Sequence, residues 1–519
     1  MLTTYIVPMG TSAVSFGHIT FDTELGLLSR DGVRLAVSHR AIALLRSLIE
    51  HRGQPVSKAA LSEAAWPGQI VEEGNLTVQI AALRKTLGPM PDGNDWIVTV
   101  PRVGYRLLQQ ATPLPVRAAI AILPSLAVFP FENLSGDPEQ DYFADGVVED
   151  IITALSRFKS FAVIARNSSF VYKGRAVNVR QVATELGVRY VLEGSVRRAG
   201  PKLRISALLV DGETGAHLWA QNFDGAVEDI FDMQDRITES VVALVEPKIQ
   251  RAEIERSRRE RPESLDAYDL YLRALPDVFV SRPEANARAI ALLERVVGLD
   301  PYFAPGLAMA AEAYLLRVVM QFDGADESDA VRAIVLARAA LALTREDPTV
   351  VAYCGFVLLH IAREYETGLA LVRMAASENP NSAGILTTSG VGSLIAGDLA
   401  EAADYLQRAL RLEPNGFGTH WQLTGMAHIR IAQGQYEDAL DWAMRSQAIN
   451  ASYDATHWML IAANAYLGRM HEAQKYLAAL EKISPGINLS RIRRGQNSLD
   501  PHRIDVLIEG LRLAGLPEE

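Results

Sequence analysis

The chain has 519 residues, a formal net charge of −11 and an apolar content of 49%. This length exceeds what a single hydrophobic core usually holds, so we expect three or four domains of roughly 150 residues each. The acidic balance excludes a protein that coats nucleic acid over its whole surface, but it allows one small module that reads DNA.

Cysteine content and hydropathy indicate the compartment. Cys354 is the only cysteine, so the chain has neither an internal disulfide nor a cysteine cluster for zinc, which fits a reducing cytoplasm. We expect Cys354 to fill a core position. The most apolar stretch, residues 118–131, contains two prolines and is shorter than the roughly 20 apolar residues of a membrane helix. The N-terminus lacks a signal-peptide pattern. We therefore predict a cytoplasmic protein that makes no membrane contact.

The N-terminal part of the chain predicts a small sheet followed by two helices. Residues 14–37 alternate in short β-like pieces, which indicates an antiparallel sheet. Ser38 then begins a predicted helix as its N-cap, and Gly53 ends it. A second predicted helix is capped by Ser57 and ends before Pro67, because proline cannot continue a helix.

Residues 71–87 predict an amphipathic helix, and residues 96–107 predict a hairpin after it. At about 100° per residue, one narrow stripe of the helix collects four apolar side chains, namely Leu76, Ile80, Leu83 and Leu87. The hairpin consists of two β-rich runs that are broken at Pro101 and Arg102. A helix followed by a hairpin favours a winged helix.

Two motifs, NLTVQIAALRKTLG and TVPRVGYRL, resemble the C-terminal effector domain of OmpR/PhoB-type response regulators. The resemblance covers about residues 14–108. It implies that the helix at residues 71–87 enters the major groove of double-stranded DNA and that the hairpin reaches an adjacent minor groove. It also places a polymerase-contacting loop at residues 66–72, so RNA polymerase is a candidate partner. Trp66 itself is interpreted as a core residue.

The candidate DNA contacts lie on the outward face of this helix, on its flanks and in the hairpin. Amide side chains suit adenine, the Val78 side chain suits a thymine methyl group, and the cationic side chains suit phosphate. The alternative for Arg84 is a surface salt bridge. Ala81 and Ala82 offer no hydrogen bonds, so specificity is expected to depend on dimerisation or on DNA shape. The predicted DNA-binding residues are Asn75, Thr77, Val78, Gln79, Arg84, Lys85 and Arg102.

After a linker at residues 111–124, residues 125–250 alternate strand and helix, which predicts an α/β domain with a mixed sheet. The motifs FPFENLSGDPEQDYFADG, ELGVRYVLEGSVRR and TGAHLWAQNFD resemble the TolB-like domain of bacterial regulators, a resemblance that implies no chemistry. Acidic residues near its start could suggest a metal or acid/base site, but we interpret them as a loop and a charged helix N-terminus. They are Asp137, Glu139, Asp141, Asp145, Glu149 and Asp150.

A charged connector at residues 251–265 leads to a helical repeat at residues 266–519. Six positions, mostly proline, recur at intervals of 47, 32, 34, 37 and 34 residues, and a mostly small residue precedes each by twelve. The recurring positions are Pro301, Pro348, Pro380, Pro414, Ala451 and Pro485, and the preceding ones are Ala289, Leu336, Gly368, Ala402, Ala439 and Ala473. This is the period of tetratricopeptide repeats, which stack into a solenoid with a groove for a protein or peptide. Three tryptophans, Trp421, Trp442 and Trp458, are expected in the repeat core.

The predicted fold class is therefore multidomain, α+β and all-α: a winged helix at residues 1–110, a TolB-like α/β domain and a tetratricopeptide α-solenoid. We expect a one-component, DNA-binding transcriptional regulator that forms homo-oligomers, without a cofactor, a metal or enzymatic activity. Few residues precede the winged helix, so the signal is expected to arrive through the domains behind it. Two alternatives stay open, a membrane-anchored CadC-type regulator and a tetratricopeptide scaffold without operative DNA binding.

Overall fold

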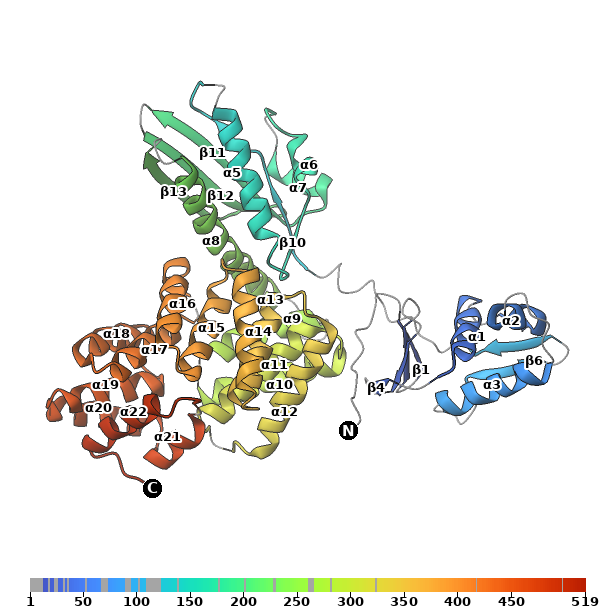
Figure 1. Cartoon of the computed structure of the whole chain (residues 1–519). Coiled ribbons are helices and arrows are strands. Elements are labelled where there is room, and N and C mark those ends of the chain that lie inside the picture. The colour runs from blue at the N-terminus through green and yellow to red at the C-terminus, as the bar shows by residue number, and fades with distance from the viewer. Residues whose placement is uncertain are drawn as a thin grey trace. The chain divides into compact units, whose positions relative to one another are not determined.

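The protein forms two compact units, residues 1–122 and residues 123–519, and each is described here by itself (Figure 1). The structure is a computed structural model. It describes residues 13–16, 19–22, 27–30, 33–34, 37–51, 54–66, 73–88, 95–100, 103–108, 123–137, 140–175, 178–199, 202–226, 230–259, 266–280, 282–322, 324–416, 418–496 and 498–519.

The described residues of the first unit form two small antiparallel sheets and three helices. A four-stranded meander comprises β1 (Ala13–Phe16), β2 (Ile19–Asp22), β3 (Leu27–Arg30) and β4 (Val33–Arg34). The helices are α1 (His39–Glu50), α2 (Lys58–Ala65) and α3 (Glu73–Leu87). The second sheet has the order β5-β7-β6, with β5 at Val56–Ser57, β6 at Ile97–Val100 and β7 at Gly104–Leu107. The predicted sheet, helices and hairpin are confirmed, whereas β5 is an addition.

Caps and a leucine-rich core hold the helices of this unit in place. The Ser38 hydroxyl accepts a hydrogen bond from the Ala41 amide, and the Ser57 hydroxyl accepts one from the Ala60 amide, so both predicted N-caps are present. The predicted α3 stripe is buried in one cluster with leucines of α1 and with Trp66, which confirms Trp66 as a core residue. One face of α3 is therefore fixed by the core, and the opposite face is outward.

The second unit begins with a six-stranded mixed sheet, as predicted. Its order is β10-β8-β11-β12-β13, with β9 parallel to β11; β10, β8 and β11 run parallel, and β11, β12 and β13 run antiparallel. The strands are β8 (Ser125–Val128), β9 (Glu132–Asn133), β10 (Ala162–Val163), β11 (Tyr190–Ala199), β12 (Lys202–Asp211) and β13 (His217–Ala226). The associated helices are α5 (Gln140–Leu155), α6 (Arg166–Phe170), α7 (Val179–Leu186) and α8 (Ile230–Arg259). Helices α5 and α8 share one apolar core with the sheet, and α7 joins a smaller cluster.

The acidic residues at the start of this unit serve the structure. Asp145 forms an ion pair with Lys173 at 2.6 Å, and Glu149 lies 3.9 Å from Arg166. Asp150 accepts a hydrogen bond from the Gln234 side chain, and Asp141 accepts one from Asn133. These contacts agree with the interpretation as a charged helix start, except that Glu139 lies outside the described residues.

A helical repeat completes the second unit. Its helices are α9 (Ala267–Phe279), α10 (Pro283–Leu299), α11 (Ala304–Val319), α12 (Glu327–Leu343), α13 (Pro348–His360), α14 (Tyr365–Glu378), α15 (Ala383–Ala396), α16 (Leu399–Leu412), α17 (Thr419–Ala432), α18 (Tyr436–Ile449), α19 (Asp454–Tyr466), α20 (Met470–Ile483), α21 (Leu489–Gly495) and α22 (His502–Leu513). All six residues that precede the recurring positions are buried. Four of them are alanine, one is glycine and one is leucine. Cys354 is fully buried in α13, as expected.

Contacts between remote repeats close the array upon itself. The Asn450 side chain donates to the Val280 carbonyl at 3.3 Å, and Arg282 donates to the Ser452 hydroxyl at 2.9 Å. Arg491 of α21 donates to the carbonyl of Gln321 at 2.6 Å, which joins the C-terminal segment to the loop after α11. Helix α22 packs on α17 and α19. The early and late helices of the repeat are thus held together directly.

Helix α8 extends from residue 230 to residue 259, so residues 251–259 of the predicted connector are helical. The Glu253 carboxylate, 1% exposed, accepts hydrogen bonds from Tyr190 at 2.6 Å and from Arg189 at 2.8 Å, both at the start of β11 or just before it. Arg256 reaches both Glu253 and Asp269 of α9. The charged side chains at this joint, where α8 meets β11 and α9, thus pair with one another.

The packing of α13 against α14 generates a stability prediction. A Cβ on Gly368 would lie 2.5 Å from the Leu359 Cβ and 2.6 Å from the Gly355 carbonyl oxygen, whereas a Cβ on Gly298 would meet no atom within 4 Å. We expect Gly368→Ala to lower the free energy of unfolding by about 2 kcal/mol through overpacking. The control Gly298→Ala should raise it by about 0.5 kcal/mol, since alanine favours a helix. Chemical denaturation measures both, and equal stability of the two variants would contradict the close packing.

Candidate nucleic-acid interface

The outward face of α3 carries most of the predicted DNA-binding residues. Asn75, Thr77, Val78 and Lys85 are exposed, and the Val78 side chain is 64% exposed although it is apolar. Lys85 lies in the last turn, where a cation is favoured by the helix dipole. The structure therefore brings these four side chains together on one face, opposite the buried stripe.

Arg84 joins α3 to the hairpin. Its Nε donates to the Ile97 carbonyl at 2.7 Å, its guanidinium donates to the Thr99 hydroxyl at 3.1 Å, and it lies 3.4 Å from the Asp95 carboxylate. The guanidinium also lies over the Tyr105 ring, 6.0 Å from its centroid. In this structure Arg84 has the alternative role named from the sequence, a salt bridge, and it orients the hairpin relative to the helix.

Two predicted DNA contacts remain, Gln79 and Arg102. Gln79 is half-buried, and its Oε1 accepts a hydrogen bond from the Ser38 hydroxyl at 2.7 Å, which ties α3 to the start of α1. Arg102 and residues 67–72, most of the predicted polymerase-contacting loop, lie outside the described residues.

Gly104 is a structural residue of this site that the sequence reasoning did not single out. A Cβ at this position would lie 2.1 Å from the Val56 carbonyl oxygen and 2.9 Å from the Lys58 amide nitrogen. Only glycine lets β7 approach β5 so closely, and Tyr105 beside it is buried. The glycine before a buried tyrosine in the GYRL run was the signal that could have indicated this contact.

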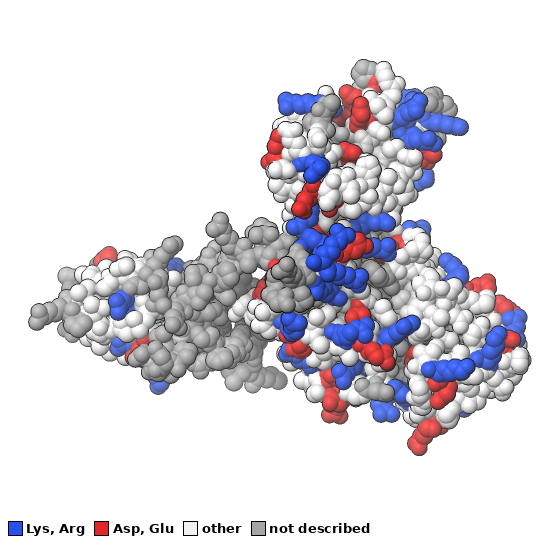
Figure 2. All heavy atoms as spheres, turned by 180° about the vertical axis from the view of Figure 1, so that it is seen from behind, with Lys and Arg blue, Asp and Glu red and all other residues white. Residues whose placement is uncertain are grey.

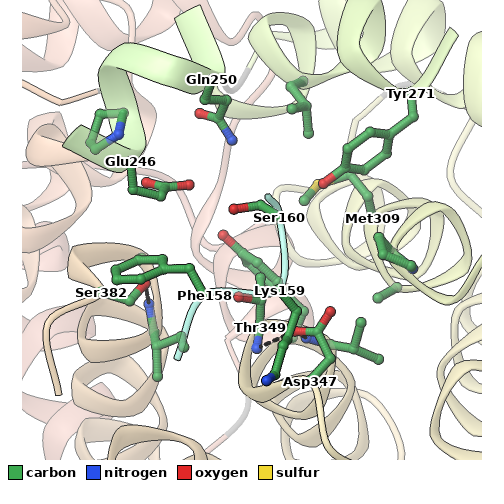
Figure 3. A pocket seen from close by; sticks show the side chains of 18 of the residues that line it. Phe158, Lys159, Ser160, Glu246, Gln250, Tyr271, Met309, Asp347, Thr349 and Ser382 are labelled. Carbon is green, nitrogen blue, oxygen red and sulfur yellow. Dashed lines mark hydrogen bonds between the residues drawn. The ribbon is translucent and has the colours of Figure 1, made fainter. Parts of the chain in front are cut away.

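A large cavity in the second unit is a separate candidate site, which we call the outer chamber (Figure 3). It contains about 1420 Å³ of empty space, part of it open to solvent, and is lined by residues 158–161, α8, α9 and the start of several repeat helices. Glu246 and Gln250 of α8 and Tyr271 of α9 line it, and Lys159 lies beside Asp347 on its opposite side (Figure 3). Burial raises the pKa of Glu246 to about 8 and raises the pKa of Asp347. The sequence did not predict this cavity, because its walls come from remote segments.

Two family models match parts of the chain. Residues 32–107 match "Transcriptional regulatory protein, C terminal", and residues 122–240 match "HilA/YgeH-like transcriptional regulator, second domain". The second match covers the α/β region and is a match to a domain of a transcriptional regulator. It neither supports nor contradicts the resemblance of this region to TolB-like domains.

Three similar proteins match the chain over different lengths. Transcriptional regulator HilA of Salmonella typhimurium is 23% identical over 79% of this chain and 72% of its own length. Putative adenylate cyclase 3 of Rhizobium meliloti is 44% identical over 43% of this chain, and the chain spans only 38% of that protein. The solved DNA-binding domain of Escherichia coli CadC is 30% identical, with 20% of this chain and 94% of that one covered and a TM-score of 0.18. Residues 32–107 thus form a winged-helix domain of the transcriptional-regulator type, and the chain is related to HilA over most of its length.

Proposed function

We propose that this protein is a DNA-binding transcriptional regulator whose helix α3 enters the major groove and whose β6–β7 hairpin reaches an adjacent minor groove. The observation that carries the proposal is the orientation of α3, whose buried stripe leaves one face with Asn75, Val78 and Lys85 exposed. The match of residues 32–107 to the regulator family supports it.

In this proposal some side chains contact bases and others contact phosphates. Asn75 has the donor and acceptor that adenine requires, and Val78 suits a thymine methyl group. Thr77, Lys85 and Arg102 are proposed phosphate contacts, and Gln79 would read a base only by leaving Ser38. Arg84 is a positioning residue that sets the hairpin.

The second unit is proposed to sense a signal or to dock a partner. Its α/β region is assigned as TolB-like and its repeat as tetratricopeptide, on the sequence motifs and spacing. Homo-oligomerisation and a contact with RNA polymerase belong to the same proposal. Within the part of the chain that the structure describes, no helix is both long and apolar enough to cross a membrane. The scaffold alternative predicts that this chain does not bind DNA, which the next experiment decides.

The double substitution Lys85→Ala and Arg102→Ala tests the phosphate contacts. We expect weaker binding to most DNA sequences. The slope of the salt dependence should fall by about 2, because a protein with two fewer phosphate contacts releases fewer counterions from the DNA when it binds. Fluorescence anisotropy at several salt concentrations measures both. Lys475→Ala with Lys482→Ala removes the same charge from exposed positions of α20 and should change neither value. An unchanged slope in the first variant would refute the interface.

Arg84→Ala separates positioning from phosphate binding. Loss of its hydrogen bonds to Ile97 and Thr99 should lower the stability of the first unit by about 1 kcal/mol and weaken DNA binding. The salt slope should stay unchanged, because the guanidinium is engaged within the protein. Thermal unfolding and the anisotropy titration provide the two readouts. A slope that falls by about 1 with unchanged stability would instead make Arg84 a phosphate contact.

A further inference from the structure

The inner helices of the repeat enclose a second cavity, which we call the inner chamber. It contains about 880 Å³ of empty space, part of it open to solvent, and is lined by α11, α13, α15, α17 and α19 together with Arg503 of α22. Thr387, Thr388 and Trp421 line both chambers, so the two are adjacent.

Two buried polar groups line the inner chamber without a partner among the described residues. Glu312 of α11 is 3% exposed, and its Oε2 has no hydrogen bond; the indole Nε1 of Trp458 on α19, also 3% exposed, has none either. A buried carboxylate without a partner is costly, because it has lost its water and gained nothing in return. Such a group in a cavity wall is the signature of a site that a ligand completes.

The other side chains that line the inner chamber suit an organic cation with an apolar body. Trp421, Tyr453 and Phe356 provide aromatic rings, whose faces attract cations. Leu315 and Met459 are among the aliphatic side chains of the same wall. An ammonium group would therefore find a carboxylate, and the carbon skeleton attached to it would find an apolar surface.

The opposite side of the chamber is electropositive. Arg503 is buried, and its Nη1 lies 3.2 Å from His428 Nδ1 on α17. Glu312 belongs to α11 and His428 to α17, so the two groups line the chamber from different helices. A second ammonium group reaching toward Arg503 would be repelled, which disfavours diamines.

We propose that the inner chamber binds an organic monoamine, whose ammonium group pairs with the Glu312 carboxylate and whose apolar body packs against Trp421, Tyr453 and Phe356. A hydroxyl or carbonyl oxygen on the body would accept a hydrogen bond from Trp458 Nε1. This site is independent of the winged helix, so it can stand or fall without the proposed DNA binding.

Binding of the monoamine should depend on pH through the ionisation of Glu312. The ionisable groups that face Glu312 should keep their protonation state between pH 6 and pH 8. Burial raises the pKa of Glu312 to about 8, so at neutral pH the carboxyl is mostly protonated and must lose its proton when the ammonium binds. On α13 the pKa values of Tyr353 and Cys354 are raised by burial, and that of His360 is lowered to about 3. Across the chamber burial raises the pKa of Tyr453, lowers that of His428, and lowers that of Arg503 to about 10. None of these groups titrates between pH 6 and pH 8.

Charged groups on the other helices packed against α11 are engaged with one another. Arg317 of α11 pairs with Asp329 of α12, and Glu294 of α10 pairs with Arg332 and accepts from Tyr314. On α9, burial raises the pKa of Tyr271. Affinity for a monoamine should therefore rise roughly 50-fold from pH 6 to pH 8 and about twofold more above pH 8, as the carboxylate of a group with a pKa of about 8 becomes available.

The test uses the full chain and calorimetric titration at pH 6, 7 and 8. The probes are 2-phenylethylamine, its neutral counterpart 2-phenylethanol and the diamine 1,6-diaminohexane. We expect the monoamine to bind with the predicted pH dependence and to change tryptophan fluorescence, and the other two probes to bind at least tenfold more weakly. Absence of monoamine binding, or equal binding of the neutral probe, would overturn the proposal.

Two isosteric substitutions locate the site. Glu312→Gln should weaken monoamine binding at pH 8 by at least 30-fold and abolish its pH dependence. Glu246→Gln is the matched control, since this carboxyl has a similarly raised pKa but lies in the outer chamber. Circular dichroism melts establish that both variants fold. Binding lost in Glu246→Gln and kept in Glu312→Gln would refute the inner chamber, and the anisotropy titration with DNA reports separately on the winged helix.

Discussion

The buried carboxylate of Glu253 is the constraint on which the second unit depends. It lies near the C-terminal end of the long helix α8 and is satisfied only when Tyr190, Arg189 and Arg256 all donate to it. Because removing a partner from a buried charge costs about 3 to 5 kcal/mol, the start of β11 and the second half of α8 must adopt one arrangement. Arg256 extends this network to Asp269 of α9, so the repeat is aligned with the sheet at the same point. Glu253 also lines the outer chamber, so this network forms part of the wall of that cavity.

Charge is distributed unevenly over the surface of the second unit. On the face seen in Figure 2, Lys and Arg side chains gather where the sheet and the repeat meet, with fewer acidic side chains among them. On α8, the side chains of Arg251, Arg258 and Arg259 are exposed, whereas Arg256 pairs with the buried Glu253. One side of α8 thus carries a buried network of ion pairs, and another side carries basic residues exposed to solvent. This is the pattern of an amphipathic helix.

Much of the fold could be predicted from sequence because local patterns determine it. The stripe from Leu76 to Leu87, the caps Ser38 and Ser57 and the small residues of the repeat each depend on a spacing or on one side chain. The candidate sites were less predictable. Arg84 turned toward Asp95 because the hairpin returns alongside α3, and Glu312 meets Trp458 in one chamber only because the array curves. Contacts between remote segments decide such cases, and no local pattern encodes them. The DNA-contact roles of all seven predicted residues stay predictions.

Closure of the repeat array has a consequence for how the protein folds. Repeat proteins usually depend on interactions between nearest neighbours, so their ends fray first and partly unfolded arrays are populated. Here Arg282 meets Ser452 and Gln321 meets Arg491, so residues 170 apart in sequence hold the two ends of the array together. Neither end can fray without breaking these contacts. The array should therefore unfold as one cooperative unit, and it should fold slowly for a helical protein, because a long loop must close before the final contacts form.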